Sequence, residues 1–359
     1  MTRPESGFQK TITKPFVLRG QPYQPSRPVT LSFHPAPPNT GIVFRRSGVE
    51  LSVNLDTLRH GGFGTNAVLG WNNTEIRSGR HVVSTPEHLL AALRAAGVDN
   101  VYIDISGKHV PQFDWSARPI MRKLSDNLIS QQAKRKSLFV DFNVPDVRVL
   151  RNRDQLDQLR ARLERRGILP DVFHIKPGVP HIVFDSEDTS KPDLIIVRPA
   201  KGVRIGSGFG YASHAAFQPD QFHFMPLDRQ HFMDEVMDAR SPGFVGLWKG
   251  RGARLLLALG RIPLPGGFRI HGMTERNLVV SGLPSNRHVL NNPEHFQTKL
   301  RYAGQEMARH KTMDTLGAIA ALPGYLQDVE IFVFKASHAR VISALKELHA
   351  KFIEPHNSA

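Results

Sequence analysis

Two short stretches of the chain carry the residue types of a hydrolytic metal site. They read Ser84-Thr85-Pro86-Glu87-His88-Leu89 and Arg309-His310-Lys311-Thr312-Met313-Asp314. In a helix, His310 and Asp314 at positions i and i+4 lie on one face. Two histidines and one aspartate suit a catalytic metal ion, and Glu87 would remain as a base. Taken alone, the second stretch is more typical of a hydrogen-bonded His–Asp pair in a protein core, and the first is equally common by chance.

The composition is that of a globular protein without cysteine chemistry. The chain has 359 residues, of which 40% are hydrophobic and 22% are charged, enough for one large or two medium domains. Cysteine is absent, so disulfides and thiolate metal sites are excluded and any zinc must be held by His and carboxylate. The N-terminal residues lack the apolar core of a signal peptide and no apolar run reaches the length of a membrane span. We therefore expect a cytoplasmic protein.

The charge balance is strongly basic. A net charge of +15 and a pI near 10.3 favour polyanions, such as a phosphorylated substrate or an anionic membrane surface touched peripherally. A solvated basic surface without any partner is the plain alternative. The chain has no zinc-finger or RNA-recognition signature, so nucleic acid is not an expected partner. The oligomeric state does not follow from the sequence.

The elements that must position these residues alternate between strands and helices. Strands are predicted at 29–33, 41–44, 100–105, 138–140, 194–197, 277–280 and 329–334. Helices are predicted from Pro86 to near Gly97 with Ser84 or Thr85 as cap, and at 154–166, 298–322 and 339–352. The polar, basic stretch at 130–136 separates two predicted α+β domains, 1–134 and 135–359. The glycines of 206–210 are expected to form a turn, and His34, His109, His214 and His223 to lie at the surface or in loops.

The helix predicted over 298–322 carries the second stretch. One stripe of this helix holds Ala303, Met307, His310, Asp314, Gly317 and Ala321. Since most of these residues are small or apolar, the stripe is expected to be buried. A buried His and a buried Asp need each other or a metal ion as partner.

Further stretches in the same order resemble a known enzyme family. They are Gln9-Lys10-Thr11-Ile12, Val29-Thr30-Leu31, Pro35-Ala36-Pro37, Asn39-Thr40-Gly41, Val98-Asp99-Asn100, Pro111-Gln112-Phe113-Asp114-Trp115-Ser116-Ala117, Ala239-Arg240-Ser241-Pro242-Gly243-Phe244 and Lys335-Ala336-Ser337-His338. With the two opening stretches, their order and spacing resemble the zinc-dependent UDP-3-O-acyl-N-acetylglucosamine deacetylases of lipid A biosynthesis. The matches extend over most of the chain.

The resemblance implies a fold and a metal site. The fold would be two βααβ-type sandwich domains with helices packed between the sheets, and the active site would lie at their junction. The resemblance makes His88, His310 and Asp314 the zinc ligands, with a fourth position open for water. Iron(II) is the other ion that such ligands suit.

The resemblance also implies roles for the residues around the ion. Glu87 would be the general base, and a protonated His338 would stabilise the oxyanion and help the amine to leave. The hydroxyl of Ser241 would donate to the oxyanion. Lys311 would face a substrate phosphate, and Phe244 would border the acyl chain of an acylated UDP-amino-sugar. The products would be a free amine and acetate.

The sequence departs from the family pattern around this site. Gln24 stands in place of a His, Trp115 of a Gly, Pro242 of a Phe, Ser337 of a Gly and Ala318 of an Asp, and the loop 271–273 keeps one Gly of two. A carboxylate missing at 318 should lower the pKa of His338 and loosen its orientation. Segment 146–182 is also longer than its family equivalent. These departures leave open a second hypothesis, a paralogue that binds a nucleotide sugar or another polyanion as a regulator without turnover.

Overall fold

The structure is a computed structural model that describes residues 7–22, 27–62, 72–125, 127–165, 175, 178–185, 193–210, 221–244, 279–281, 300–302 and 304–353. The predictions for Gln24, His214, Ala303 and 271–273 lie outside these residues. Among the described residues, no helix is long and apolar enough to cross a membrane.

The N-terminal half is built on a five-stranded sheet in the order β2-β3-β9-β4-β5. Its strands are β2 (Phe16–Gly20), β3 (Val29–Pro35), β4 (Ile42–Arg46), β5 (Val49–Ser52) and β9 (Val101–Ile105). Burial alternates along β3, where Val29, Leu31 and Phe33 point into the core, as period-2 patterning requires. Two helices, α1 (Glu87–Ala96) and α2 (Arg118–Leu124), accompany this sheet.

A second, three-stranded sheet of the N-terminal half leads directly into α1. Its strands are β6 (Leu58–Gly62), β7 (Asn72–Ser78) and β8 (His81–Ser84), in antiparallel order. Because β8 ends three residues before the first residue of α1, this sheet fixes where that helix begins.

The C-terminal half is built on a six-stranded sheet in the order β12-β13-β14-β20-β15-β16. Its strands are β12 (Val149–Leu150), β13 (His181–Asp185), β14 (Leu194–Pro199), β15 (Arg204–Phe209), β16 (Gln221–Pro226) and β20 (Val329–Phe334). The helices of this half are α3 (Arg153–Arg165), α4 (Arg229–Glu235), α6 (Glu306–Ile319) and α7 (His338–Phe352). The pairing is mixed, because β20 is antiparallel to β14 and parallel to β15.

Three two-stranded ribbons complete the described sheets. They pair β1 (Phe8–Ile12) with β10 (Leu128–Lys134), β11 (Ser137–Phe139) with β19 (Tyr325–Gln327), and β17 (Pro242–Phe244) with β18 (Val279–Ser281). The pairing of β1 with β10 brings together the two ends of the predicted domain 1–134, although its boundary remains a prediction.

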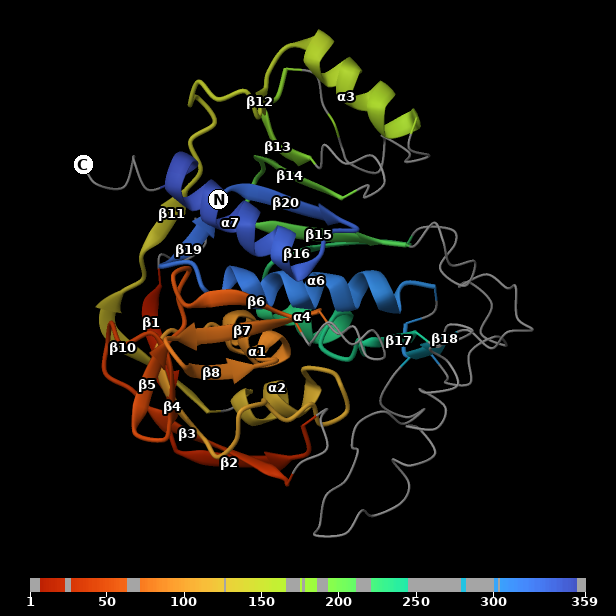
Figure 1. Cartoon of the computed structure of the whole chain (residues 1–359). Coiled ribbons are helices and arrows are strands. Elements are labelled where there is room, and N and C mark those ends of the chain that lie inside the picture. The colour runs from red at the N-terminus through yellow and green to blue at the C-terminus, as the bar shows by residue number, and fades with distance from the viewer. Residues whose placement is uncertain are drawn as a thin grey trace.

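Helices lie between the two large sheets. Figure 1 shows α1 and α6 in the middle of the molecule, with the five-stranded sheet on one side and the six-stranded sheet on the other. One apolar cluster runs continuously through these layers, from Leu31 and Phe44 to Met313 and Leu345. The predicted α+β class is therefore confirmed, and the two halves share one core.

The helix α3 confirms the helix predicted at 154–166. Leu156, Leu159 and Leu163 are each 1% exposed and pack with Ile196 and Phe334 of the six-stranded sheet. In Figure 1 this helix lies on the side of the sheet opposite to α6. The segment that looked like an extension therefore covers the outer face of the sheet.

Two expectations about helix starts were wrong. The helix with His310 begins at Glu306 because Gly304 has a φ of 69°, which a right-handed helix cannot contain. The cap of α1 is Pro86, without a side-chain hydrogen bond, so neither Ser84 nor Thr85 caps it. The hydroxyl of Ser84 instead donates a hydrogen bond to the carboxylate of Glu75, so Ser84 does not cap the helix.

The turn expected at 206–210 is wrong, because Gly206 and Gly208 lie within β15. A Cβ at either position would come within 2.4 Å of a phenylalanine ring, of Phe224 or of Phe334. These glycines therefore make room for aromatic packing on a strand.

Three of the four histidines expected at the surface or in loops lie in the described residues, and their environments differ. His34 is half-exposed on β3, where it pairs with Asp104. His109 is buried, and so is His223, which lies on β16 against Thr312. The expectation was therefore wrong for His223, which is buried on a strand, whereas His109 is buried in the segment between β9 and α2.

Candidate metal centre

The site forms where α1 and α6 approach each other without a side chain between them. Gly317 of α6 faces the backbone of Glu87, and a Cβ at this glycine would lie 2.4 Å from the Glu87 carbonyl oxygen. This close approach brings the first turn of α1 against the middle of α6. It is what places two stretches of chain more than 200 residues apart at one point.

A strained residue turns the chain from β8 into α1. Thr85 has a φ of 60°, a conformation that is rare for a β-branched residue. Its N–H donates to the carbonyl of Thr74 at 2.9 Å and its hydroxyl donates to the Ser84 carbonyl at 2.6 Å. These bonds hold the strained turn, which directs Glu87 inward.

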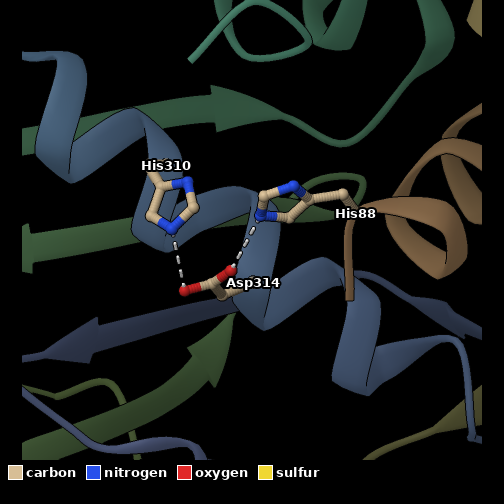
Figure 2. A group of neighbouring side chains, drawn as sticks. All are labelled: His88, His310 and Asp314. Atoms are coloured by element: carbon tan, nitrogen blue, oxygen red, sulfur yellow. Dashed lines mark ion pairs between the residues drawn. The ribbon is translucent and has the colours of Figure 1, made fainter. Parts of the chain in front are cut away.

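His88, His310 and Asp314 meet as the sequence predicted (Figure 2). Nε2 of His88 is 3.6 Å from Oδ1 of Asp314, and Nε2 of His310 is 3.4 Å from Oδ2. One ligand atom from each of the three lies within 4.8 Å of the others. Ligands at about 2.0–2.1 Å from a tetrahedral ion are about 3.3 Å apart. The three side chains therefore fit one shared ion, and burial lowers the pKa of His310 to about 4, which keeps this imidazole neutral for coordination.

Asp314 is ringed by nitrogen atoms from four side chains. Besides the two predicted ligands, Nε2 of His338 lies 3.5 Å away and Nζ of Lys311 lies 3.8 Å away. Burial alone would raise the pKa of Asp314, but these neighbours outweigh it and hold that pKa well below its usual range. The carboxylate is therefore ionised, as a metal ligand must be.

Glu87 has the opposite electrostatic environment. Burial, and then the negative charge of Asp314, raise the pKa of Glu87 to about 7. Its carboxylate accepts a hydrogen bond from the backbone N–H of Thr74. A buried carboxyl that exchanges its proton near neutral pH is suited to general acid–base work.

His338 and Lys311 also line the site, beside Asp314. Burial, and then Lys311, lower the pKa of His338 to about 3. Lys311 is only 12% exposed, and burial lowers its pKa although Asp314 and Glu87 act in the opposite direction. Its ammonium therefore lies inside the site.

Thr74 also lines the site, although it was not among the residues predicted from the sequence. Its hydroxyl lies 3.3 Å from Nδ1 of His338, and its backbone holds Glu87. The available signal was the register of β7, in which Thr74 shares a face with the buried Ile76. A polar residue on the inward face of a strand is a candidate for a site.

Comparison of the sequence with known proteins finds relatives that share one activity name. Residues 9–157 match the family model described as LpxC, UDP-3-O-acyl N-acetylglycosamine deacetylase. A protein of that activity name from Geotalea uraniireducens is 26% identical over 96% of this chain and 87% of its own length. One from Syntrophotalea carbinolica is 36% identical over 36% of this chain and 40% of its own length. A Shewanella protein of the same name is 26% identical over 92% of this chain and 86% of its own.

Residues 9–157 are therefore similar to the UDP-3-O-acyl N-acetylglycosamine deacetylase family. Against the first three relatives, the matched part of the chain spans only 40–42% of their length. The matches to the weaker relatives continue through the C-terminal half, which carries His310 and Asp314.

Two departures from the family pattern have a structural explanation. Trp115 occupies the glycine position and keeps a glycine-like backbone with a φ of 62°, while its ring is 3% exposed. Ser337, in place of the other glycine, caps α7 by accepting a hydrogen bond from the N–H of Arg340. The second exchange therefore adds a cap to the helix whose first residue is His338.

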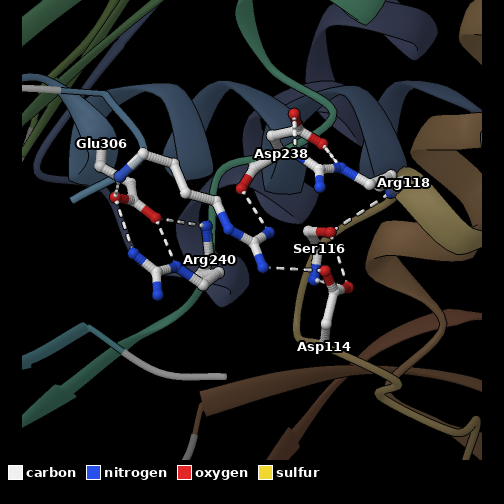
Figure 3. Close-up of polar contacts among 7 residues, drawn as sticks. Asp114, Ser116, Arg118, Asp238, Arg240 and Glu306 are labelled. Carbon is white, nitrogen blue, oxygen red and sulfur yellow. Dashed lines mark hydrogen bonds and ion pairs between the residues drawn. The ribbon is translucent and has the colours of Figure 1, made fainter. Parts of the chain in front are cut away.

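An ionic network ties the loop after β9 to the start of α6 (Figure 3). Arg240 and Glu306 form a pair in which the side chains are 3% and 1% exposed. Arg301 bridges Asp114, the carbonyl of Asp238 and Glu306, and Arg118 pairs with Asp238. The buried Ser241 directly follows Arg240. The network thus anchors the segment that carries Ser241 and the first turn of α6.

Proposed function

We propose that this chain is a zinc-dependent, cytoplasmic N-deacetylase that hydrolyses the acetamide of a UDP-3-O-acyl-N-acetylglucosamine-like sugar in lipid A biosynthesis. Water and the amide would give a free amine and acetate. The observation that carries the proposal is the pairing of a three-ligand metal site with Glu87. Burial raises the pKa of this carboxyl to about 7, and the carboxyl lies beside the proposed ligands.

The donor set supports zinc at this position. Two imidazole nitrogens and one carboxylate oxygen make a three-ligand site of the catalytic type, and cysteine ligands are absent from the chain. When bound, the ion would polarise the amide carbonyl and acidify a water molecule. His88, His310 and Asp314 would hold it.

The surrounding side chains have proposed roles in proton transfer and binding. Glu87 would accept the proton of the attacking water and later release it to the leaving amine, which its pKa near neutrality permits. His338 and the hydroxyl of Ser241 would donate hydrogen bonds to the oxyanion. The ammonium of Lys311 would bind an anionic part of the substrate, and Phe244 would border the acyl chain.

The proposal is tested by metal analysis and by a deacetylation assay on the same preparations. We expect about one divalent ion per chain in the wild type, and its loss in His88→Ala, His310→Ala and Asp314→Ala. Incubation with UDP-3-O-acyl-N-acetylglucosamine, followed by mass spectrometry, should show the loss of one acetyl group.

The control is Glu87→Gln, which keeps the size of the side chain but removes the base. This variant should retain the ion and lose at least about a hundredfold in kcat. Metal retained in all three ligand variants would overturn the site assignment. A metal-loaded wild type that leaves the acetyl group in place would overturn the proposed reaction.

A further inference from the structure

The ion pair between Arg240 and Glu306 lies next to one of the proposed metal ligands. Glu306 is the first residue of α6 and comes one helical turn before His310, on the same face of the helix. Burial lowers the pKa of His310, and a backbone contact with Ala239 acts in the opposite direction, so the residue before Arg240 lies against this imidazole. The pair therefore joins the helix that carries His310 to the segment that contacts its ring.

Four N–H groups hold both carboxylate oxygens of Glu306. Its Oε1 accepts from the backbone N–H of Arg240 at 3.2 Å and from Nε of Arg240 at 2.8 Å. Its Oε2 accepts from Nη2 of Arg240 at 3.2 Å and from the backbone N–H of Arg301 at 2.7 Å. A planar guanidinium that binds a carboxylate at two points fixes its orientation as well as its distance. The first turn of α6 can therefore neither slide nor rotate freely against segment 239–241.

The other end of the ligand-bearing stretch of α6 is also fixed. Gly317 meets the backbone of Glu87 there, with no side chain between the two helices. His310 and Asp314 lie between this contact and Glu306 in the sequence of α6. Both ligands are therefore placed between two fixed points of the helix.

The burial of the pair separates its effect on position from its effect on stability. The side chains of Arg240 and Glu306 are only 3% and 1% exposed. Taking both charges out of water costs free energy that their attraction often only repays, so packed apolar side chains of similar size can stabilise a protein equally well. Apolar contacts are not directional, however. An apolar replacement can match the stability of this pair but not the position that it imposes.

We propose that Arg240 and Glu306 are positioning residues that set the His310 imidazole for the metal ion, so that this pair controls metal affinity. Glu306 acts through the first turn of α6, and Arg240 acts through Ala239. The inference rests on the proposed function for the presence of the ion.

The double variant Arg240→Met with Glu306→Leu tests this inference in the full chain. Urea unfolding of the metal-free protein would measure stability, and competition with a chromogenic chelator would measure zinc affinity. The matched control is the double variant Arg198→Met with Glu330→Leu, a pair whose side chains are 12% and 3% exposed. Glu330 lies at the start of β20, whereas the metal site adjoins the residues that follow its end.

We expect both double variants to fold, with unfolding midpoints close to that of the wild type. Loss of the pair that holds a ligand in place should weaken zinc binding by at least about tenfold in the Arg240 and Glu306 variant. The control should keep zinc affinity within about twofold, because distant sites act independently. A merely structural pair would not change zinc affinity once stability is restored.

Wild-type zinc affinity in the folded Arg240 and Glu306 double variant would overturn the proposal, and so would an equal loss in the control. If that double variant fails to fold, Arg240→Lys decides, because lysine keeps the charge and loses the two-point contact. Weaker zinc binding in Arg240→Lys would support the proposal, and wild-type affinity would overturn it.

Failure of the proposed function would be recognised separately. A wild type that binds no zinc would overturn the proposed metal site and this inference with it. A wild type that binds zinc but leaves the acetyl group in place would overturn the proposed reaction, whereas the role of the pair would still follow from the zinc affinities.

Discussion

The contact between Gly317 and Glu87 gives the sharpest test of how the site is assembled. In Gly317→Ala the new methyl group would lie 2.4 Å from the Glu87 carbonyl oxygen and 3.0 Å from its carbon, whereas ordinary contact begins at 3.4 Å. The opposing atoms belong to the backbone, so no side chain can rotate away. The two helices must therefore separate by about 1 Å.

Two energies oppose each other in this variant. Replacing glycine by alanine inside a helix stabilises it by about 1 kcal/mol. Overpacking costs about 1–3 kcal/mol, and we expect the upper end because rigid backbone is involved. The net effect should be a loss of about 2 kcal/mol in the free energy of unfolding.

The effect on the metal should exceed the effect on stability. A separation of about 1 Å is several times the tolerance of about 0.2 Å for ligand distances in a metal site. His88 lies on one helix and Asp314 on the other, so we expect zinc affinity to fall at least about tenfold. Urea unfolding of the metal-free protein would measure stability, and competition with a chromogenic chelator would measure affinity.

The control is the pair Ser343→Gly and Ser343→Ala at an exposed position of α7. This pair reports the helix-propensity difference without crowding. If Gly317→Ala raised stability by the same amount as this pair and kept wild-type zinc affinity, the argument from close helix approach would be refuted.

Three further predictions follow from buried groups. Arg240→Met should lower the free energy of unfolding by about 3–5 kcal/mol, because it leaves the Glu306 charge buried without its partner. The double variant Arg240→Met with Glu306→Leu should recover much of this loss. Equal losses in the single and the double variant, measured by urea unfolding, would contradict the prediction. Burial, and then nearby Lys108, lower the pKa of His109 to about 4, so the unfolded chain takes up the proton first. Stability should therefore fall from pH 6.5 towards pH 4, by up to about 3 kcal/mol from this group, and His109→Gln should flatten that slope. Leu159→Ala should cost about 2–4 kcal/mol by opening a cavity under α3, a value that a calorimetric scan can check.

Much of the scaffold could be predicted because its signals are local. The alternation of Val29, Leu31 and Phe33 marks a strand, and the spacing of Leu156, Leu159 and Leu163 marks a helix. The spacing of His310 and Asp314 placed both on one helix face, while their proposal as ligands came from the resemblance to a family pattern. These patterns depend on neighbours within one element, which a sequence displays directly.

The parts that were missed depend on contacts between distant segments. A glycine-rich stretch such as that around Gly206 is typical of a turn. Its actual role, to leave room for the ring of Phe224, depends on a strand that the local sequence does not show. His223 looks like a surface residue until Thr312 and Glu235 satisfy both of its ring nitrogens. Thr74 carries no motif, because its importance comes from two groups that reach it from other parts of the chain.

The helix α3 covers one face of the six-stranded sheet, and this affects how the protein behaves in solution. Without this helix, Val183, Leu194, Ile196, Phe332 and Phe334 would form an apolar surface on folded protein. Such surfaces make molecules associate, and nascent chains that expose them engage chaperones. The sheet edge beside α3 is β12, whose two residues offer few free backbone groups for pairing with another strand. By covering this apolar face, α3 helps to keep the folded protein soluble. We expect a variant that lacks the segment around α3 to aggregate.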